Sequence, residues 1–271
     1  MQLTKHHGLG NDFLVALEEV NGPLEAGPDL ARRLCDRRRG LGADGLIVGT
    51  RPAEADGDDV DIVMHLWNAD GSRAEMSGNG IRCLGQALAI SRDDERAHYL
   101  VRTDGGLRRV DVSQPSGDPS ADVSVTMGAI VEGPAVPDVA AKRLGERRHA
   151  TADIGNPHLV VLVDDLSEVD LVGDGSWFET QFPAGVNVEF IALGPEPDTL
   201  TLRVWERGAG VTEACGTGAT AAAHLARSWG LVGDQVRVEM PGGPATVVLD
   251  GDEPVLVGPS VLIATIEVAD A

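Results

Sequence analysis

The stretch EACGTGATAAAHLA, from Glu213 to Ala226, decides the fold that we expect of this chain. It reads as a tight turn that runs into a helix of small and apolar residues, and a helix that is apolar nearly all round is a buried one. A second stretch of the same design, EMSGNGIRCLGQALA, extends from Glu75 to Ala89. In both, a Glu and one spacer precede Ser77 or Cys215, and Gly-x-Gly follows. The sequence therefore predicts a turn into a buried helix once in each half.

Strand-like segments surround both predicted helices. They are rich in β-branched residues, partly alternating with polar ones, and Gly, Pro, Asp or Asn separates one from the next. These segments are Val60–Trp67, Arg108–Val112, Val123–Met127, His158–Val163, Thr201–Trp205, Gln235–Met240, Ala245–Leu249 and Val261–Val268. Such spacing predicts an α+β fold with antiparallel sheets rather than a regular βαβ repeat. The stretch Ser113–Asp122, rich in Pro and Gly, is the expected junction between two similar lobes.

Charge and cysteine content narrow the possible partners. The formal net charge of −21 over 271 residues argues against nucleic acid or an anionic membrane as a partner. The basic cluster from Arg32 to Arg39 is expected to be the solvated end of a helix over Pro28–Arg38, not an anion site. Three cysteines cannot all pair and match no zinc pattern, so we expect reduced thiols and no metal site. Without a signal core or a segment of ~20 apolar residues, the expected location is the cytoplasm.

The chemistry of the two turns follows from the start of a helix. Gly-x-Gly lets backbone N–H groups face outward, and the partial positive charge there attracts a carboxylate or a phosphate. The same charge lowers the pKa of a thiol, which would make Cys215 a proton carrier or a nucleophile. One such turn alone is more often only a helix start, and neither has the Lys of a P-loop or the setting of a Rossmann unit. Two turns facing one another across a cleft would hold a small ligand between two proton-handling side chains, which suits racemisation or epimerisation.

Eight motifs occur along the chain in a definite order. They are HGLGNDF (His7–Phe13), GLGADGL (Gly40–Leu46), NADGS (Asn68–Ser72), EMSGNGIRC (Glu75–Cys83), GNPH (Gly155–His158), FPAGVNVEF (Phe182–Phe190), VWERGAGVTEACGTGA (Val204–Ala219) and PGG (Pro241–Gly243). In these motifs and their order, nearly end to end, the sequence resembles the diaminopimelate epimerase family. The segments GNG and ERGAG separate it from the related proline racemase group.

The resemblance implies two pseudo-symmetric lobes, each a mostly antiparallel, barrel-like sheet around a central helix. We expect 1–116 with about 259–271 to form the N-terminal lobe and 117–258 the C-terminal lobe, with the active site in the cleft between them. It also implies an isomerase that uses no cofactor, forms a homodimer and interconverts LL- and meso-diaminopimelate for lysine and peptidoglycan synthesis. In that family two thiols flank the substrate α-carbon, one as base and one as acid.

Site residues carry over one by one onto the matching motifs. Cys215 falls on one catalytic thiol and Ser77 on the other, while His158 and Glu206 fall where the family keeps polar partners near the thiols. Four asparagines would hydrogen-bond the two amino-acid ends of the substrate: Asn11, Asn68, Asn156 and Asn187. Glu206 and Arg207 would hold the distal or amino groups. The α-carboxylate would be bound by backbone N–H groups of Gly78, Asn79, Gly216 and Thr217.

The serine at position 77 is a departure from the family pattern. A hydroxyl is far less acidic than a thiol, whose ordinary pKa is ~8.5, and it needs a neighbouring base. Three interpretations stay open. The chain is an epimerase with a Ser/Cys pair in which His158 or Glu206 assists the hydroxyl, or an impaired member that binds diaminopimelate without efficient turnover, or an epimerase, dehydratase or isomerase acting on another amino acid. The first is favoured because the other residues that would grip diaminopimelate are present.

Overall fold

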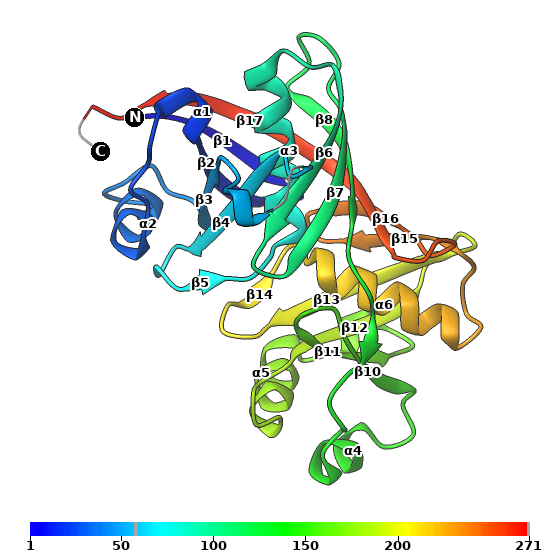
Figure 1. Ribbon diagram of the computed structural model, residues 1–271. Helices are drawn as coiled ribbons and strands as arrows, with labels where there is room; N and C mark the ends of the chain where they lie inside the picture. The colour runs from blue at the N-terminus through cyan, green and yellow to red at the C-terminus, as the bar shows by residue number, and fades with distance from the viewer. Residues whose placement is uncertain (57–58, 270–271) are drawn as a thin grey trace. The chain divides into compact units, whose positions relative to one another are not determined.

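The structure is a computed structural model that describes residues 1–56 and 59–269. Residues 57–58 and 270–271, which fall within the predicted N-terminal lobe, lie outside the described residues. The chain divides into two compact units, Met1–Thr126 with Gly258–Ala271, and Met127–Val257 (Figure 1). Each unit combines many strands with few helices, so the α+β fold predicted from the sequence is confirmed.

The first unit is a sheet wrapped around one helix, α3 (Gly78–Arg92). Its strands are β1 (Gln2–Gly8), β2 (Asn11–Leu17), β3 (Gly45–Thr50), β4 (Ile62–Asn68), β5 (Arg73–Ala74), β6 (Arg96–Thr103), β7 (Gly106–Ser113), β8 (Ser120–Thr126) and most of β17 (Val255–Glu267). The pairs β2–β3 and β4–β6 are parallel, and the other pairs with a defined register are antiparallel. Because β17 pairs with both β1 and β8, the sheet closes on itself. Short helices α1 (Glu18–Asn21), α2 (Pro28–Cys35) and η1 (Glu54–Asp56) lie between strands.

The second unit repeats this plan around α6 (Gly216–Ser228). Its strands are β9 (Val131–Glu132), β10 (His149–Asp153), β11 (Pro157–Leu162), β12 (Asn187–Leu193), β13 (Thr199–Glu206), β14 (Gly210–Thr212), β15 (Gln235–Met240), β16 (Gly243–Val248) and the start of β17. Successive pairs from β10 to β17 are antiparallel except β11–β12 and β13–β15, the same sequence of pairings as from β1 to β8. Its other helices are α4 (Asp138–Leu144), η2 (Leu166–Glu168) and α5 (Leu171–Gln181). The chain therefore contains one architecture twice, as the paired motifs predicted.

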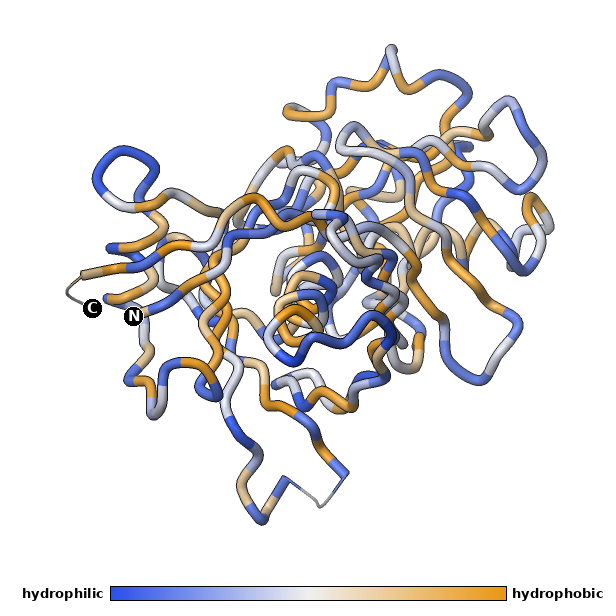
Figure 2. Tube along the Cα trace, turned by 90° about the horizontal axis from the view of Figure 1, so that it is seen from above, coloured by the Kyte–Doolittle hydropathy of each residue, from blue (hydrophilic) through white to orange (hydrophobic). Residues whose placement is uncertain are grey.

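Both central helices are buried along most of their length. Every residue from Gly78 to Ala89 in α3 is buried, and so is every residue from Gly216 to Ala223 in α6. Figure 2 shows α3 nearly end-on, with strand segments of the first unit passing around it. The fit is tight enough to require glycine at one point: a Cβ on Gly85 would lie 2.7 Å from Cγ1 of Val110 on β7. The apolar character read from the sequence thus marks burial on all sides.

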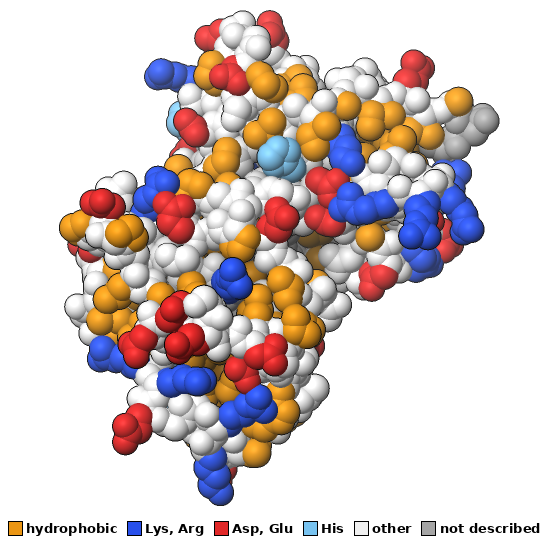
Figure 3. Space-filling model, turned by 180° about the vertical axis from the view of Figure 1, so that it is seen from behind, with side chains coloured by type: hydrophobic (Ala, Val, Ile, Leu, Met, Phe, Trp, Pro, Cys, Tyr) orange, Lys and Arg blue, Asp and Glu red, His pale blue; other side chains and the backbone are white. Residues whose placement is uncertain are grey.

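Two boundaries differ from those expected. The helix predicted over Pro28–Arg38 ends at Cys35, because Asp36 leaves the helical conformation and Arg37 turns away to ion-pair with Asp12 and Asp44. Lys and Arg side chains do gather around α2 on the face seen in Figure 3. The stretch Ser113–Asp122 is the turn of the β7–β8 hairpin, and both strands belong to the first unit. The predicted lobe limits and the cleft between lobes stay a prediction.

No helix among residues 1–56 and 59–269 is long and apolar enough to cross a membrane.

Removal of a core side chain from α3 should destabilise the chain measurably. Leu84 is fully buried and packs over Gly49 of β3, so Leu84→Ala leaves a cavity in the centre of the first unit. We expect a loss of about 2–5 kcal/mol in the free energy of unfolding, measured by denaturant titration. As a control, Leu107→Ala on β7 removes a side chain that is 41% exposed and should cost less than about 0.5 kcal/mol. Equal losses at the two positions would contradict a helix enclosed by the sheet.

Candidate active site

The two central helices begin in the same way. Ser77 is the N-cap of α3, and its Oγ accepts a hydrogen bond from the N–H of Gly80 at 3.1 Å. Cys215 is the N-cap of α6, and its Sγ accepts from the N–H of Gly218 at 3.3 Å. Both residues are in the extended conformation that a cap requires. Ser77 and Cys215 thus occupy matching positions, at the end of the helix where the N–H groups point outward.

In the first unit, the structure brings Asn11 and Asn79 together. Asn79 Nδ2 donates to Asn11 Oδ1 at 3.3 Å, and Asn11 Nδ2 donates to a carboxylate oxygen of Asp44 at 2.8 Å. Asn68 lies apart from this pair in its bonding: it ends β4, is exposed, and donates to Ser72 Oγ at 2.9 Å in the turn that follows. Gly78 and Asn79 form the first turn of α3, where backbone N–H groups can meet an anion.

In the second unit, a chain of contacts leads from the thiol to a buried carboxylate. Cys215 Sγ lies 3.4 Å from Thr217 Oγ1, which accepts from Asn156 Nδ2, also at 3.4 Å. Asn156 Oδ1 lies 3.1 Å from His158 Nε2, and His158 Nδ1 lies 2.7 Å from Glu189 Oε1. Predicted residues Asn156, His158, Cys215 and Thr217 are therefore joined in one network.

Glu189 is the member of this network that sequence reasoning missed. It is fully buried on β12, and its Oε2 has no hydrogen-bond partner among the described residues. Its Oε1 also approaches the first turn of α6, since a Cβ on Gly218 would lie 2.6 Å away. The available signal was a charged residue inside the apolar run VNVEF, because a buried carboxylate is rare without a specific partner.

Glu206, the last residue of β13, is a second carboxylate near the thiol. It accepts a hydrogen bond from Thr212 Oγ1 and interacts with Cys215. Burial raises the pKa of the Glu206 carboxyl. Burial also raises the pKa of the Cys215 thiol well above its ordinary value, and the negative charges of Glu206 and Glu189 raise it further. The sequence predicted a lowered pKa from the helix end, which is wrong because the N–H of Gly218 contributes less than burial and the two carboxylates. Cys215 is thus held as a neutral thiol, able to donate a proton.

Asn187 and Arg207 are hydrogen-bonded to each other and not to the network of residues around Cys215. Asn187 is buried, accepts from the backbone N–H of Arg207 at 2.9 Å and donates to the carbonyl of Pro157 at 3.0 Å. The side chain of Arg207 is exposed and donates to the carbonyl of Ala184 at 3.0 Å. Asn187 therefore fixes the backbone at the end of β13, while the Arg207 guanidinium stays accessible to a carboxylate.

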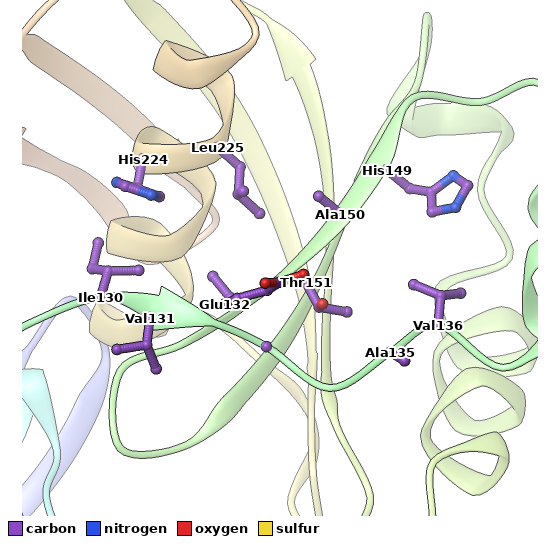
Figure 4. A pocket seen from close by; sticks show the side chains of 12 residues that line it. Ile130, Val131, Glu132, Ala135, Val136, His149, Ala150, Thr151, His224 and Leu225 are labelled. Atoms are coloured by element: carbon purple, nitrogen blue, oxygen red, sulfur yellow. The ribbon is translucent and has the colours of Figure 1, made fainter.

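Other possible sites lie outside these groups. The residues described contain no group of three or more His, Cys, Asp or Glu side chains placed to hold a metal ion. A hollow of about 510 Å³ in the second unit lies among β9, β10 and α6 (Figure 4). Its walls include Val131, His149 and His224 and none of the predicted site residues.

Comparisons with known proteins point to one family. The family model described as diaminopimelate epimerase matches residues 3–132 and 150–263. A diaminopimelate epimerase from Synechococcus elongatus is 38% identical over 262 residues, which cover 91% of this chain and 90% of that protein. Another, from Corynebacterium glutamicum, is 38% identical over 279 residues, covering 97% of this chain and 96% of that protein.

Solved structures share the fold at lower identity. A hydroxyproline epimerase from Agrobacterium vitis is similar with a TM-score of 0.74 at 20% identity, over 98% of this chain and 91% of that chain. A phenazine biosynthesis protein of the PhzF family from Bacillus anthracis has a TM-score of 0.71 at 14% identity, over 99% and 98%. These two likenesses concern the fold alone.

The thiol of Cys215 should react slowly until a neighbouring charge is removed. Glu206→Gln eliminates the larger of the two carboxylate effects on the pKa of Cys215, so the pKa falls and the reactive thiolate fraction at pH 8 rises. We expect alkylation by iodoacetamide to accelerate about tenfold, followed by mass spectrometry of the peptide containing Cys215. In both proteins the rate should climb as pH rises above the ordinary thiol pKa of ~8.5.

The matched control is Glu213→Gln, which removes an exposed carboxylate two residues before the same cysteine. Cys35 and Cys83 serve as internal references, because burial raises the pKa of Cys35 to about 12 and that of Cys83 to about 11. Equal acceleration by the two Glu variants would contradict a specific effect of Glu206 on the thiol.

Proposed function

Because the chain belongs to the diaminopimelate epimerase family, we propose that it interconverts LL- and meso-diaminopimelate by proton transfer at one α-carbon, with Cys215 and Ser77 as the proton-handling pair. The chain is an isomerase, as the family requires. The observation that carries the finer proposal is the matching position of the two side chains as N-caps of buried helices. Abstracting an α-proton creates negative charge next to the substrate carboxylate, and two helix starts supply fixed N–H groups to stabilise that charge.

Cys215 acts as the acid in one direction of this reaction. Its raised pKa keeps the thiol protonated near neutral pH, so it delivers a proton to the carbanion. In the other direction Cys215 must first lose its proton. Glu206 interacts with the thiol and is the group that takes this proton. Within the second unit Glu206 interacts with Cys215 directly, and His158 is linked to the thiol through Asn156 and Thr217, so we assign their effect to the thiol and not to the Ser77 hydroxyl.

A second candidate function is binding of diaminopimelate with little turnover. Ser77 favours this candidate, because among the described residues of the first unit its Oγ makes one side-chain hydrogen bond, accepted from the N–H of Gly80. No carboxylate or imidazole among those residues bonds the hydroxyl, so none of them is placed to accept its proton. The two candidates agree on the ligand and differ in the rate of proton transfer on the Ser77 side.

Proton exchange in deuterated water separates these candidates. With LL- and meso-diaminopimelate as separate substrates, we expect α-deuterium to enter quickly from the isomer whose proton faces Cys215 and slowly from the other, measured by NMR. Ser77→Cys should accelerate the slow side by about 10²-fold or more, the usual contribution of a general acid or base. Cys215→Ser should slow the fast side by a similar factor.

Equal exchange from both isomers in the unmodified protein would contradict a weak proton acceptor at Ser77. Calorimetric binding of diaminopimelate without deuterium entry from either isomer would replace catalysis by the second candidate. If the protein neither binds diaminopimelate nor exchanges its α-proton, both functions are excluded.

A further inference from the structure

Arg82 is a fully buried cation on α3, one turn after the Ser77 cap, and it is not among the residues assigned to proton transfer or substrate binding. Its guanidinium donates to the carbonyl of Gly78 at 3.2 Å, to Oδ1 of Asn79 at 2.8 Å and to the carbonyl of Pro259 at 3.4 Å. All three acceptors are neutral, and no ion pair to Arg82 occurs among residues 1–56 and 59–269. Burying a cation without a counter-charge is expensive. Burial accordingly lowers the pKa of Arg82 to about 10.

Two glycines leave space for the side chain of Arg82. A Cβ on Gly8 of β1 would lie 3.1 Å from Nη2 of Arg82, and one on Gly258 of β17 would lie 3.3 Å from Cζ. The absence of side chains at these glycines, on the paired strands β1 and β17, thus leaves the space that the guanidinium fills. Burying the Arg82 charge costs free energy, and its side chain restricts positions 8 and 258 to small residues. We therefore expect Arg82 to have a role that offsets this cost.

The corresponding helix of the second unit, α6, shows that no cation is needed to hydrogen-bond the carbonyl in the first turn. Thr220 of α6 lies five residues after Cys215, as Arg82 lies five residues after Ser77. Its Oγ1 donates to the carbonyl of Gly216 at 2.8 Å, the counterpart of the bond from Arg82 to Gly78. A neutral hydroxyl therefore does the same structural work in the second unit. The positive charge of Arg82 must be explained by something other than holding the helix start.

Arg82 also fixes the direction of a chain of hydrogen bonds that passes through two predicted substrate-binding residues. A guanidinium only donates, so Oδ1 of Asn79 must face it, and Nδ2 of Asn79 then faces Oδ1 of Asn11. At the far end, Asp44 as a carboxylate only accepts, so Nδ2 of Asn11 must face it. The orientation of both amides is thereby determined by chemistry at the two ends, although an isolated amide could point either way.

The Asp44 end is held by contacts of its own. Arg37 donates to Asp44 at 2.7 Å and to Asp12 at 2.7 Å, and the backbone N–H of Asp12 donates to Asp44 at 3.1 Å. Lys5 adds a second cation to Asp12 at 3.0 Å. These contacts place Asp44 against the start of β2, whose first residue is Asn11.

We propose that Arg82 and Asp44 are positioning residues that set the amides of Asn79 and Asn11 from opposite ends, and that the charge of Arg82 draws the carboxylate of an amino-acid substrate to the start of α3. This inference rests on the proposed function and adds to it the source of carboxylate recognition in the first unit. A bound carboxylate at the first turn supplies the negative charge that Arg82 lacks. The partial positive charge of the helix start and the full charge of Arg82 then act in the same direction.

The test compares substitutions at both ends of the chain of amides. Arg82→Gln removes the charge but keeps a donor, and should raise KM for diaminopimelate at least tenfold while kcat falls less than threefold. Arg82→Lys keeps the charge and should raise KM by less than Arg82→Gln. Asp44→Asn replaces an end that only accepts with an amide that can also donate, so Arg82 alone then sets the direction of the amides, and KM should rise severalfold. The double variant Arg82→Gln/Asp44→Asn should raise KM by clearly more than the product of the two single effects, since each single variant keeps one fixed end and only the double variant lets the amides reverse.

Arg92→Gln is the matched control, because Arg92 lies on the same helix but is exposed to solvent and ion-paired with Glu19 at 3.0 Å. Its KM should stay within twofold of that of the unmodified protein. An Arg82→Gln protein with a lowered melting temperature and an unchanged KM would overturn the proposal, and so would fully multiplicative effects in the double variant. Should Arg82→Gln not fold, the single variants Arg82→Lys and Asp44→Asn still test the proposal, and an unchanged KM in both overturns it.

Failure of the proposed function is distinguishable from failure of this inference. If the unmodified protein shows no exchange, the same variants are compared by calorimetric binding of diaminopimelate. A tenfold weaker binding in Arg82→Gln than in Arg92→Gln supports the role of Arg82 in carboxylate recognition even without turnover. Equal binding by these two variants overturns it.

Discussion

The start of a buried helix is the constraint on which the rest of this structure depends. The first N–H groups of a helix have no partner within the helix, and burying them unpaired is costly. The chain meets this constraint twice, with a cap that accepts the third N–H and with glycines that let the remaining groups face outward. Those outward N–H groups are what a carboxylate can bind. At Ser77 and at Cys215 the groups that the helix start leaves unpaired are therefore the same groups that could bind an anion.

The two copies of this device differ in the sign of the charge behind them. A buried cation, Arg82, lies behind the turn of α3, while two carboxylates, Glu189 and Glu206, lie near the turn of α6. Negative charge keeps the Cys215 thiol protonated, whereas positive charge at the other turn favours an anion. The two units thus share one architecture but differ at the helix start, with carboxylates near the Cys215 thiol and a buried cation after Ser77. Arg82 and Thr220 make this difference concrete, because they occupy equivalent positions and bond equivalent carbonyls.

The sequence predicted the features that depend on local pattern. Runs of small and apolar residues predicted two buried helices, and the Glu-x-Ser/Cys-Gly-x-Gly spacing predicted that Ser77 and Cys215 stand at helix starts. The eight strand-like segments all fall on strands, although strands such as β1, β10 and β12 were not recognised. What the pattern did not reveal is how segments meet. Pro and Gly in Ser113–Asp122 suggested a junction between lobes, but the same composition also suits the connection between two paired strands, β7 and β8.

Charge networks were the least predictable part of the site, for a physical reason. The pKa of Cys215 depends on burial and on carboxylates from β12 and β13, which no reading of the segment around the cysteine contains. Similarly, Arg37 appeared in the sequence as one of a run of basic residues, yet its side chain ion-pairs with both Asp12 and Asp44. Helix dipoles are local and can be read from a motif, whereas desolvation and long-range charge belong to the folded whole. For this chain the folded contribution is the larger one at Cys215 and reverses the direction that the motif alone indicates.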